Sequence, residues 1–231
     1  MSDLPEARSA PPADDSFAAS LSGFGPLGLL SFLVILAGNA IFQPLTGILV
    51  LVWARLSHTP WRDLGFSRPR SWTATVLVGV TSGIAFKFLM KAAVMPLLGA
   101  DPVNRAYHYL AGNQAALPAA LYAMIFGAGF GEETFFRGYL FERLGKRYGS
   151  GPWARAFTVA LTSAWFGVAH YSVQGLAGAE QATITGLALG TVYAMTGRIW
   201  VPMIAHAAFD LTALWMIYWD LETLVAHLIF K

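Results

Sequence analysis

Two adjacent carboxylates and an arginine lie inside an apolar stretch of this chain, at Glu132, Glu133 and Arg137. An ionisable group in hydrocarbon costs at least about 2.5–3.5 kcal/mol, so such residues are candidates for a functional site. On a helix Glu133 and Arg137 are one turn apart and can form an ion pair, whereas Glu132 points about 100° away. We expect Glu132 to face a cavity as a general base, braced by Glu133 and Arg137. The alternative is a pair of glutamates at a membrane boundary, with Arg137 extended towards water.

Phe166 and His170 lie one turn apart in a second apolar segment. A turn is expected near residues 148–152, with Glu132 about 13 helical residues before it and His170 about 16 after it, so both lie roughly 20–25 Å from the turn. An antiparallel pair of helices then brings them to a similar depth. We expect His170 to help hold a water molecule near Glu132. A buried structural histidine is the alternative.

His206 and Asp210 are also one turn apart, and the intervening Ala207 and Ala208 permit close helix approach. We expect Asp210 to fix the tautomer and orientation of His206, although a self-contained hydrogen bond would look the same. Depth is the difficulty, because His206 is only about 9 Å along its helix from the turn at Arg198. It reaches the other groups if residues 197–203 dip into the membrane, or if the basic turn at 143–155 protrudes.

Lys87 and Lys91 form a further pair one turn apart in an apolar segment. Lys91 can extend outwards to water, whereas Lys87 is deeper and can pair with an acid. We interpret both as structural.

The chain as a whole is apolar: 56% of its 231 residues are hydrophobic and 12% are charged. A soluble domain carries about 25% charged residues, so lipid must cover most of this surface. Pro44 can kink the first apolar segment, and Gly127, Gly129 and Gly131 can break the third. We therefore expect an all-α, multi-pass transmembrane helical bundle of about six to eight membrane helices. The segments run over about 24–54, 72–98, 115–143, 154–172, 179–196 and 200–219.

Composition excludes several classes of protein and site. Cysteine is absent, which excludes disulfides, thiolate metal sites and a cysteine nucleophile. A net charge of +2 does not suggest nucleic acid. Residues 1–22 are acidic and rich in proline, which predicts a disordered tail rather than a cleaved leader. Residues 221–231 are expected to be a short C-terminal tail.

Basic residues are unevenly divided among the loops. In a six-span arrangement most fall on one side, which the positive-inside rule makes cytoplasmic, with both termini external. The residues on that side are Arg55, Arg62, Arg68, Arg70, Arg143, Lys146, Arg147, Arg155 and Arg198. We expect a multi-pass integral membrane protein of a bacterial inner membrane.

These motifs, in this order, resemble the CPBP family of intramembrane proteases, which comprises the CAAX-protease and bacteriocin-processing (Abi) proteins. They are the Glu-Glu-x-x-x-Arg, Phe-x-x-x-His and His-x-x-x-Asp patterns ending at Arg137, His170 and Asp210, with Asp-Leu-Gly-Phe at 63–66. The resemblance covers about residues 60–212 and implies a protease domain over 23–220. Many members have asparagine where this chain has Asp210. An ionised aspartate cannot donate a hydrogen bond, so it could stabilise an oxyanion only when protonated.

The resemblance implies an endopeptidase that hydrolyses a peptide bond in a membrane-associated peptide or a prenylated or otherwise lipidated protein. Glu132, His170, His206 and Asp210 would be catalytic, with Glu133, Arg137 and Phe166 supporting them. Hydrolysis needs an activated water, a base and stabilisation of the oxyanion, which this set can supply. The four catalytic candidates could also ligate Zn²⁺. We favour no tightly bound metal. Membrane lipid and the substrate are the expected partners, and the sequence indicates no oligomeric state.

Two other functions fit the residues. A non-proteolytic membrane scaffold or regulator would keep the polar cluster for packing alone. A small transporter would relay protons through Glu132, Asp210 and Lys87, although no internal repeat is evident. Substitutions at Glu132 and His170 separate these, because only the protease loses an activity while remaining folded.

Overall fold

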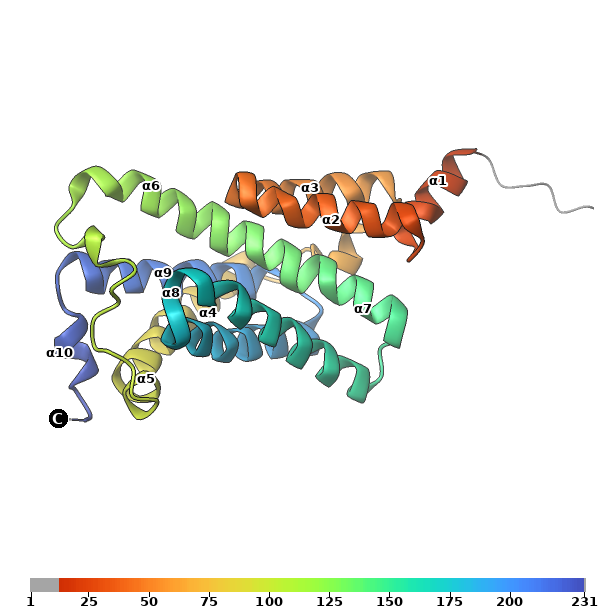
Figure 1. Ribbon diagram of the computed structural model, residues 1–231. Coiled ribbons are helices and arrows are strands. Elements are labelled where there is room, and N and C mark those ends of the chain that lie inside the picture. Colours follow the sequence, from red (N-terminus) through yellow and green to blue (C-terminus); the bar gives the residue numbers. More distant parts are fainter. Residues whose placement is uncertain (1–12, 231) are drawn as a thin grey trace, which may run out of the picture.

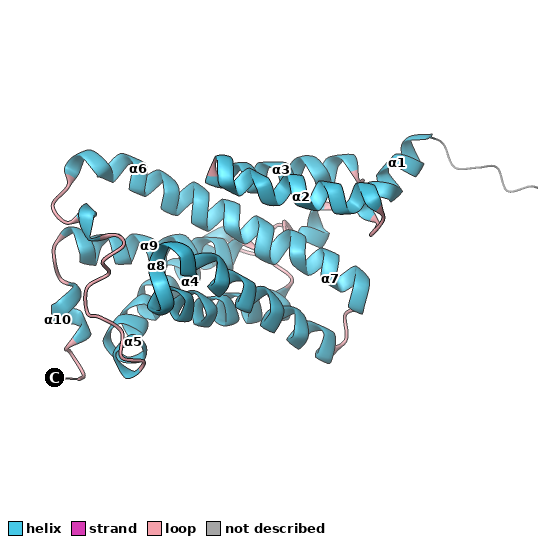
Figure 2. Ribbon diagram, in the orientation of Figure 1, coloured by secondary structure: helices cyan, strands magenta, loops and turns pink. Residues whose placement is uncertain are grey.

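The computed structural model describes residues 13–230, and in this range it consists of helices and loops without strands (Figures 1 and 2). This agrees with the expected all-α helical bundle. The elements are α1 (Ala13–Ser22), α2 (Pro26–Ile41), α3 (Gln43–Leu56), η1 (Trp61–Leu64), α4 (Trp72–Leu89), η2 (Met90–Val94), α5 (Met95–Leu97), η3 (His108–Leu110), η4 (Gln114–Ala116), α6 (Leu117–Tyr122), η5 (Ala123–Glu132), η6 (Thr134–Tyr139), α7 (Leu140–Tyr148), α8 (Pro152–Thr196), α9 (Trp200–Tyr218) and α10 (Glu222–Ala226).

Three helices are long and apolar enough to cross a membrane: Trp72–Leu97, Gln114–Tyr148 and Trp200–Tyr218. A fourth span results if the bent pair Ser16–Ser22 and Pro26–Ile41, which meet at 58°, counts as one. The outer faces of the helices carry large exposed apolar side chains such as Leu77, Leu97 and Met195. Such a surface is suited to lipid rather than water.

The first apolar segment is divided between two helices, as Pro44 predicts. Phe42 is extended, with φ −164° and ψ 117°, and it separates α2 from α3. Proline cannot continue a helix from the preceding turn but fits the first turn of a new one, which is where Pro44 lies. The two helices then pack against each other, since a Cβ added at Gly38 would lie 2.8 Å from Leu49 Cδ1.

The glycines of the third segment do not break it, contrary to the sequence prediction. Gln114–Tyr148 is one continuous helix, but η5 and η6 within it are π-helical. Glycine serves close packing here instead. A Cβ at Gly129 would lie 3.0 Å from Ala207 Cβ, and one at Gly47 would lie 3.0 Å from Gly131 Cα. Small residues thus bring α9 and α3 against the helix that carries the two glutamates.

The fourth and fifth apolar segments form a helical hairpin with almost no loop. Both belong to α8, whose helical backbone is broken at Gly175, with φ 65° and ψ −161°. Only glycine adopts a positive φ without steric cost. The halves pack closely, because a Cβ at Gly167 would lie 2.8 Å from Ala179 O and one at Gly186 would lie 3.0 Å from Ser163 Cα.

Helix α9 is held against α4 by two glycines of α4. A Cβ at Gly79 would lie 2.7 Å from Ile204 Cβ, and one at Gly83 would lie 2.3 Å from Ala205 O. The backbones therefore approach at the turn of α9 that carries His206.

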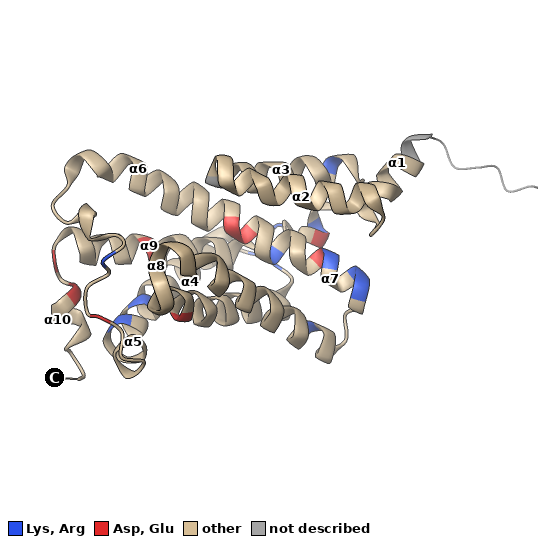
Figure 3. Ribbon diagram, viewed as in Figure 1, with Lys and Arg blue, Asp and Glu red and all other residues tan. Residues whose placement is uncertain are grey.

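The loop containing Asp63, Leu64, Gly65 and Phe66 sets the level at which α9 begins. Gly65 is left-handed at φ 85°, and its carbonyl accepts a hydrogen bond from Ile199 N at 3.1 Å. A Cβ at Gly138 would lie 3.3 Å from Leu64 O and 3.5 Å from Ile199 Cδ1. The α8–α9 turn is thus level with Gly138, and α7 extends beyond it. The basic end of α7 therefore lies beyond the α8–α9 turn, a relative level that both arrangements considered for His206 require; Figure 3 shows the cluster of Lys and Arg at the end of α7.

The expected N-terminal tail lies partly outside the described residues. Within them, Ala13–Ser22 form helix α1. The C-terminal end of α1 is attached to the bundle, because Trp53 Nε1 donates to Leu21 O at 3.1 Å and Arg143 donates to Ser22 O and Gly23 O.

Candidate active site

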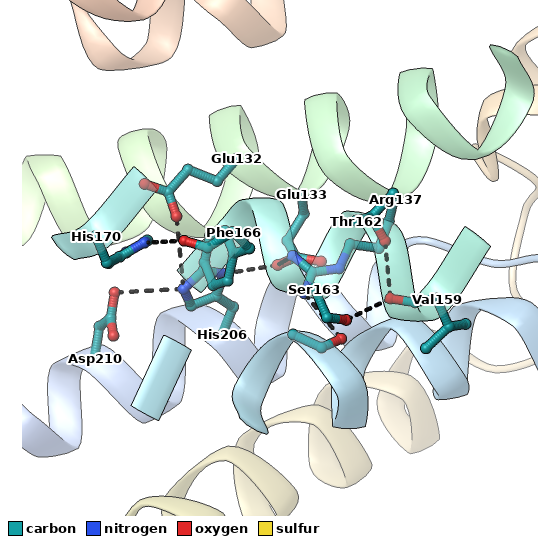
Figure 4. A network of polar contacts seen from close by, with 11 residues as sticks. Glu132, Glu133, Arg137, Val159, Thr162, Ser163, Phe166, His170, His206 and Asp210 are labelled. Carbon is teal, nitrogen blue, oxygen red and sulfur yellow. Dashed lines mark hydrogen bonds and ion pairs between the residues drawn. The ribbon is translucent and has the colours of Figure 1, made fainter. Parts of the chain in front are cut away.

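A buried chain of polar contacts runs from Arg137 through Glu133 to His206 (Figure 4). Arg137 Nη1 and His206 Nδ1 each lie 2.7 Å from Glu133 Oε1. Glu133 is 0% exposed, Arg137 1% and His206 4%. Arg137 Nη2 also donates to Gly186 O at 3.3 Å, which joins the set to α8. A carboxylate paired with a guanidinium accepts, so Nδ1 of His206 is the donor.

This geometry corrects the expected role of Asp210. The sequence predicts that Asp210 fixes the tautomer of His206, but Glu133 binds Nδ1 instead. Asp210 faces the other ring nitrogen, with Oδ2 3.7 Å from Nε2. The correction was hard to foresee, because the spacing along α9 says nothing about a residue on η5–η6.

Nε2 of His206 lies between two carboxylates. Besides Asp210, Glu132 Oε2 is 3.9 Å from it. Both separations exceed hydrogen-bond length, so a small polar group can bridge them. Glu132 Oε2 is buried and has no hydrogen-bond partner among the described residues. An unpartnered buried carboxylate oxygen is costly, which is typical of a group that binds water or a ligand.

His170 is fixed by its own helix. Its Nδ1 lies 2.7 Å from Phe166 O, one turn earlier in α8. Since a carbonyl only accepts, Nδ1 carries the proton and Nε2 is left with a lone pair. The ring of Phe166 packs edge-on against His170 at 4.4 Å and against His206 at 5.7 Å between centroids. The Arg137 guanidinium lies over the same ring at 5.0 Å. Phe166 thus positions three polar side chains.

The four residues predicted to be catalytic line one cavity of about 330 Å³, namely Glu132, His170, His206 and Asp210. Helices η5, α8 and α9 supply them. The fold therefore brings together three motifs that are far apart in the sequence. Glu133 and Arg137 are absent from the cavity wall and lie behind His206.

Other polar residues of the cavity were not identified from the sequence. Tyr107 lies in the loop after α5, and its hydroxyl accepts from Gln174 Nε2 at 3.3 Å. Burial, and then the charges of Asp210 and Glu132, raise the pKa of the Tyr107 phenol, which therefore remains a donor at neutral pH. Gln174 flanks the break at Gly175, and Gln181 follows Glu180 in the second half of α8. A glutamine within a helix of an apolar chain was the available signal.

Lys87 also reaches the cavity wall. Its Nζ donates to Gln181 Oε1 at 3.1 Å and lies 4.7 Å from the centroid of the Phe209 ring. The sequence allowed pairing with an acid, and the hydrogen-bond partner in the structure is the amide of Gln181.

The donor set does not form a metal site as it stands. Among residues 13–230, no three His, Asp or Glu side chains are arranged to hold a metal ion. Nδ1 of His206 is bound to Glu133 and Nδ1 of His170 to Phe166 O, so only the Nε2 atoms of these two rings could ligate a metal.

Comparison with known proteins gives one match. Residues 114–212 match the family model described as type II CAAX prenyl endopeptidase Rce1-like. This part of the chain is therefore similar to the Rce1-like family of CAAX prenyl endopeptidases. None of the curated proteins or solved structures compared with the chain matches it. The matched range contains every residue of the predicted site, whereas helices α1–α4 lie outside it.

Family and fold agree on the general class of protein. Rce1-like proteins are intramembrane proteases of the CAAX type, and the apolar helices described above are those of an integral membrane protein.

Proposed function

We propose that this protein hydrolyses a peptide bond by means of a water molecule activated by Glu132. The observation that supports this most directly is the pairing of Glu132 Oε2, buried and without a hydrogen-bond partner, with His206 Nε2 3.9 Å away, on the wall of a cavity shared with His170. A base and an electrophilic group face the same small space. That is the arrangement required for attack on a carbonyl carbon.

Glu132 takes a proton from water while the water oxygen attacks the scissile carbonyl carbon. His170 accepts a hydrogen bond from the same water through Nε2, because its Nδ1 is bound to Phe166 O. His206, in the form protonated on both ring nitrogens, donates from Nε2 to the developing oxyanion while Nδ1 donates to Glu133. Glu132 then passes its proton to the leaving amine nitrogen as the C–N bond breaks. Atoms and charges balance without any further reactant.

Glu133, Arg137 and Asp210 prepare His206 for this role. Glu133 holds Nδ1 and so aims Nε2 at the cavity, and Arg137 forms a buried ion pair with Glu133. Asp210 Oδ2, 3.7 Å from Nε2, attracts a proton to that nitrogen. An ionised Asp210 itself has no proton to give to an oxyanion.

We propose a membrane-associated or lipidated peptide as the substrate and a bacterial inner membrane as the location. The family description supports a lipidated chain, and the apolar outer faces of the helices support delivery of the peptide from within the bilayer. A cavity lined by Leu36, Phe135 and Trp165 besides its polar groups suits an apolar substrate segment.

We also propose that hydrolysis needs no tightly bound metal, since Glu132, His170 and His206 together provide base, water holder and electrophile. The purified protein should retain its turnover after dialysis against a chelator such as 1,10-phenanthroline. Loss of activity that added Zn²⁺ restores would overturn this part of the proposal.

The function is tested with the full chain reconstituted in phospholipid vesicles and a library of farnesylated and unfarnesylated peptides. Mass spectrometry should detect a cleavage product with wild type and none with Glu132→Gln or His170→Ala. Both variants should remain folded by size-exclusion chromatography and thermal melting. Full turnover by either variant, or no cleavage of any peptide by wild type, would contradict the proposal.

A further inference from the structure

A second cavity, of about 460 Å³, adjoins the candidate active site. It lies between the end of α4, the loop after α5, the hairpin tip of α8, and α9–α10. Polar side chains common to both cavity walls mark the junction, and these are Lys87, Asn104, Gln174 and Gln181. A chain bound across the active site can therefore continue into this compartment.

Most charges in the second compartment are already neutralised. Lys91 Nζ lies 2.8 Å from Glu222 Oε1, and this pair is buried. Arg105 Nη2 lies 2.7 Å from Asp101 Oδ2 at the exposed rim. Glu222 also accepts from Asn104 N at 3.1 Å. These ion pairs fix the loop in place and leave little charge for a ligand.

Lys87 differs from its neighbours. It is 5% exposed, and no acidic side chain of residues 13–230 lies within ion-pair distance of it. Its ammonium has three donors, of which one is used by Gln181 Oε1 and one side is covered by the Phe209 ring. A buried cation retains hydrogen-bonding capacity where the two cavities join.

A buried cation without an anion is costly unless a ligand supplies the missing charge. Lys87 Nζ lies over the ring of Phe209. Phe209 is three residues after His206 on α9, or about 4.5 Å along the helix axis. A bound peptide rises about 3.4 Å per residue, so a group on Lys87 lies a few residues from the scissile bond.

We propose that Lys87, supported by Gln181, binds a carboxylate of the substrate and thereby selects peptides that bear one a few residues from the cleaved bond. The proposal rests on the proteolytic function above and adds a specificity-determining residue to it. Two sources share this chemistry: the free carboxylate at a peptide's C-terminus, and an Asp or Glu side chain. Beyond Lys87 the compartment wall carries the Lys91–Glu222 pair, whose charges are already matched, and we take the ligand to be a chain end.

The test compares matched peptides with wild type and with two variants, Lys87→Met and Lys87→Arg. Peptides cleaved by wild type are resynthesised with a C-terminal acid, with a C-terminal amide, and with an amide plus an acidic side chain near the end. Wild type should prefer the acid by about 10- to 100-fold in kcat/KM, the worth of one charge-assisted hydrogen bond. Lys87→Met should abolish this preference mainly through KM, and Lys87→Arg should keep part of it.

Arg105→Gln is the matched control, because Arg105 borders the same compartment but is exposed and already paired. Its acid-to-amide ratio should equal that of wild type. Binding of the product peptide to the Glu132→Gln protein, measured by calorimetry, provides a readout without turnover and should show the same preference for the acid.

The outcomes separate the two proposals. A wild-type ratio near one, or equal losses on acid and amide in Lys87→Met, would overturn the carboxylate site and leave the protease function intact. If wild type instead prefers the amidated peptide that carries an acidic side chain, Lys87 binds a side-chain carboxylate. That result would overturn the assignment of the site to a C-terminal carboxylate. If Lys87→Met does not fold, the wild-type ratio and the calorimetry with Glu132→Gln decide the question.

Discussion

Glu133 Oε1 lies 2.7 Å from Nδ1 of His206, and this contact determines which ring nitrogen faces the cavity. Glu132, the adjacent residue, faces the opposite ring nitrogen at 3.9 Å. Neighbouring glutamates on one helix thus face the two ring nitrogens of one imidazole, and only Glu133 lies within hydrogen-bond distance. Glu133 is buried in an ion pair and Glu132 borders the cavity. The same substitution should therefore affect stability at Glu133 and turnover at Glu132.

Glu133→Gln should destabilise the fold, whereas Glu132→Gln should abolish turnover. Removing the charge of Glu133 leaves Arg137 buried without its partner, which costs about 3–5 kcal/mol. Glu132 Oε2 has no hydrogen-bond partner to lose. The free energy of unfolding of Glu132→Gln should therefore stay within about 1 kcal/mol of the wild-type value. Thermal melting in detergent, together with peptide cleavage, measures both. Equal stability of the two variants would contradict the assignment of Glu133 as the buried support.

Gly83→Ala should disturb the site from a distance. The added Cβ would lie 2.3 Å from Ala205 O, next to His206, so α9 must shift away from α4. Overpacking of this kind costs about 1–3 kcal/mol, and the shift should lower kcat. Gly145→Ala on α7 is the control, because no atom lies within 4 Å of its Cβ. There alanine should stabilise the helix by about 0.5–1 kcal/mol. Wild-type activity in Gly83→Ala would show that α9 does not need this close approach.

Phe166→Leu should lower kcat by about 10- to 100-fold with little change in KM. The ring packs on His170, His206 and the Arg137 guanidinium, and displacement of catalytic groups by about 1 Å can cost a factor of 100. Phe157→Leu makes the same chemical change on the same helix, where the ring contacts Tyr148 far from the cavity. Steady-state kinetics on a cleaved peptide distinguish them. Similar kcat values for the two variants would remove the positioning role of Phe166.

The buried pair of Lys91 and Glu222 should control the loop over residues 98–113. Lys91 Nζ binds Glu222 Oε1 and Pro102 O, and Glu222 accepts from Asn104 N. Lys91→Met leaves a buried carboxylate unpaired, which costs about 3–5 kcal/mol and should expose the loop to proteases. The double variant Lys91→Met with Glu222→Leu should recover much of the stability. If the double variant is no more stable than Lys91→Met, the Lys91–Glu222 ion pair does not hold the loop in place.

The sequence predicted the main features of the fold because burial of charge in an apolar chain leaves few arrangements. Glu132, His170 and His206 were expected to meet, and they line one cavity. Pro44 was expected to interrupt the first segment, and the chain turns at Phe42. The interruption depends on local chemistry that one turn expresses alone, whereas the meeting follows from the small number of polar side chains that three apolar helices carry.

Other features depend on contacts between distant segments, and these were predicted wrongly or left open. The spacing of His206 and Asp210 suggested their pairing, whereas Glu133 on another helix takes the Nδ1 position. Gly127, Gly129 and Gly131 suggested a broken helix, whereas neighbours packed against them keep it continuous and π-helical. The level of α9 followed only from the docking of Gly65 on Ile199.

The break of α8 at Gly175 has a consequence for how wide the candidate active site can open. His170 lies before the break and Gln181 after it, on walls that meet at this one residue with a φ of 65°. Rotation about a single backbone bond therefore changes the gap between His170 and the Gln181 amide that contacts Lys87. Any side chain at position 175 would be strained at this φ whatever its size, so a substitution there should alter the width of the cavity.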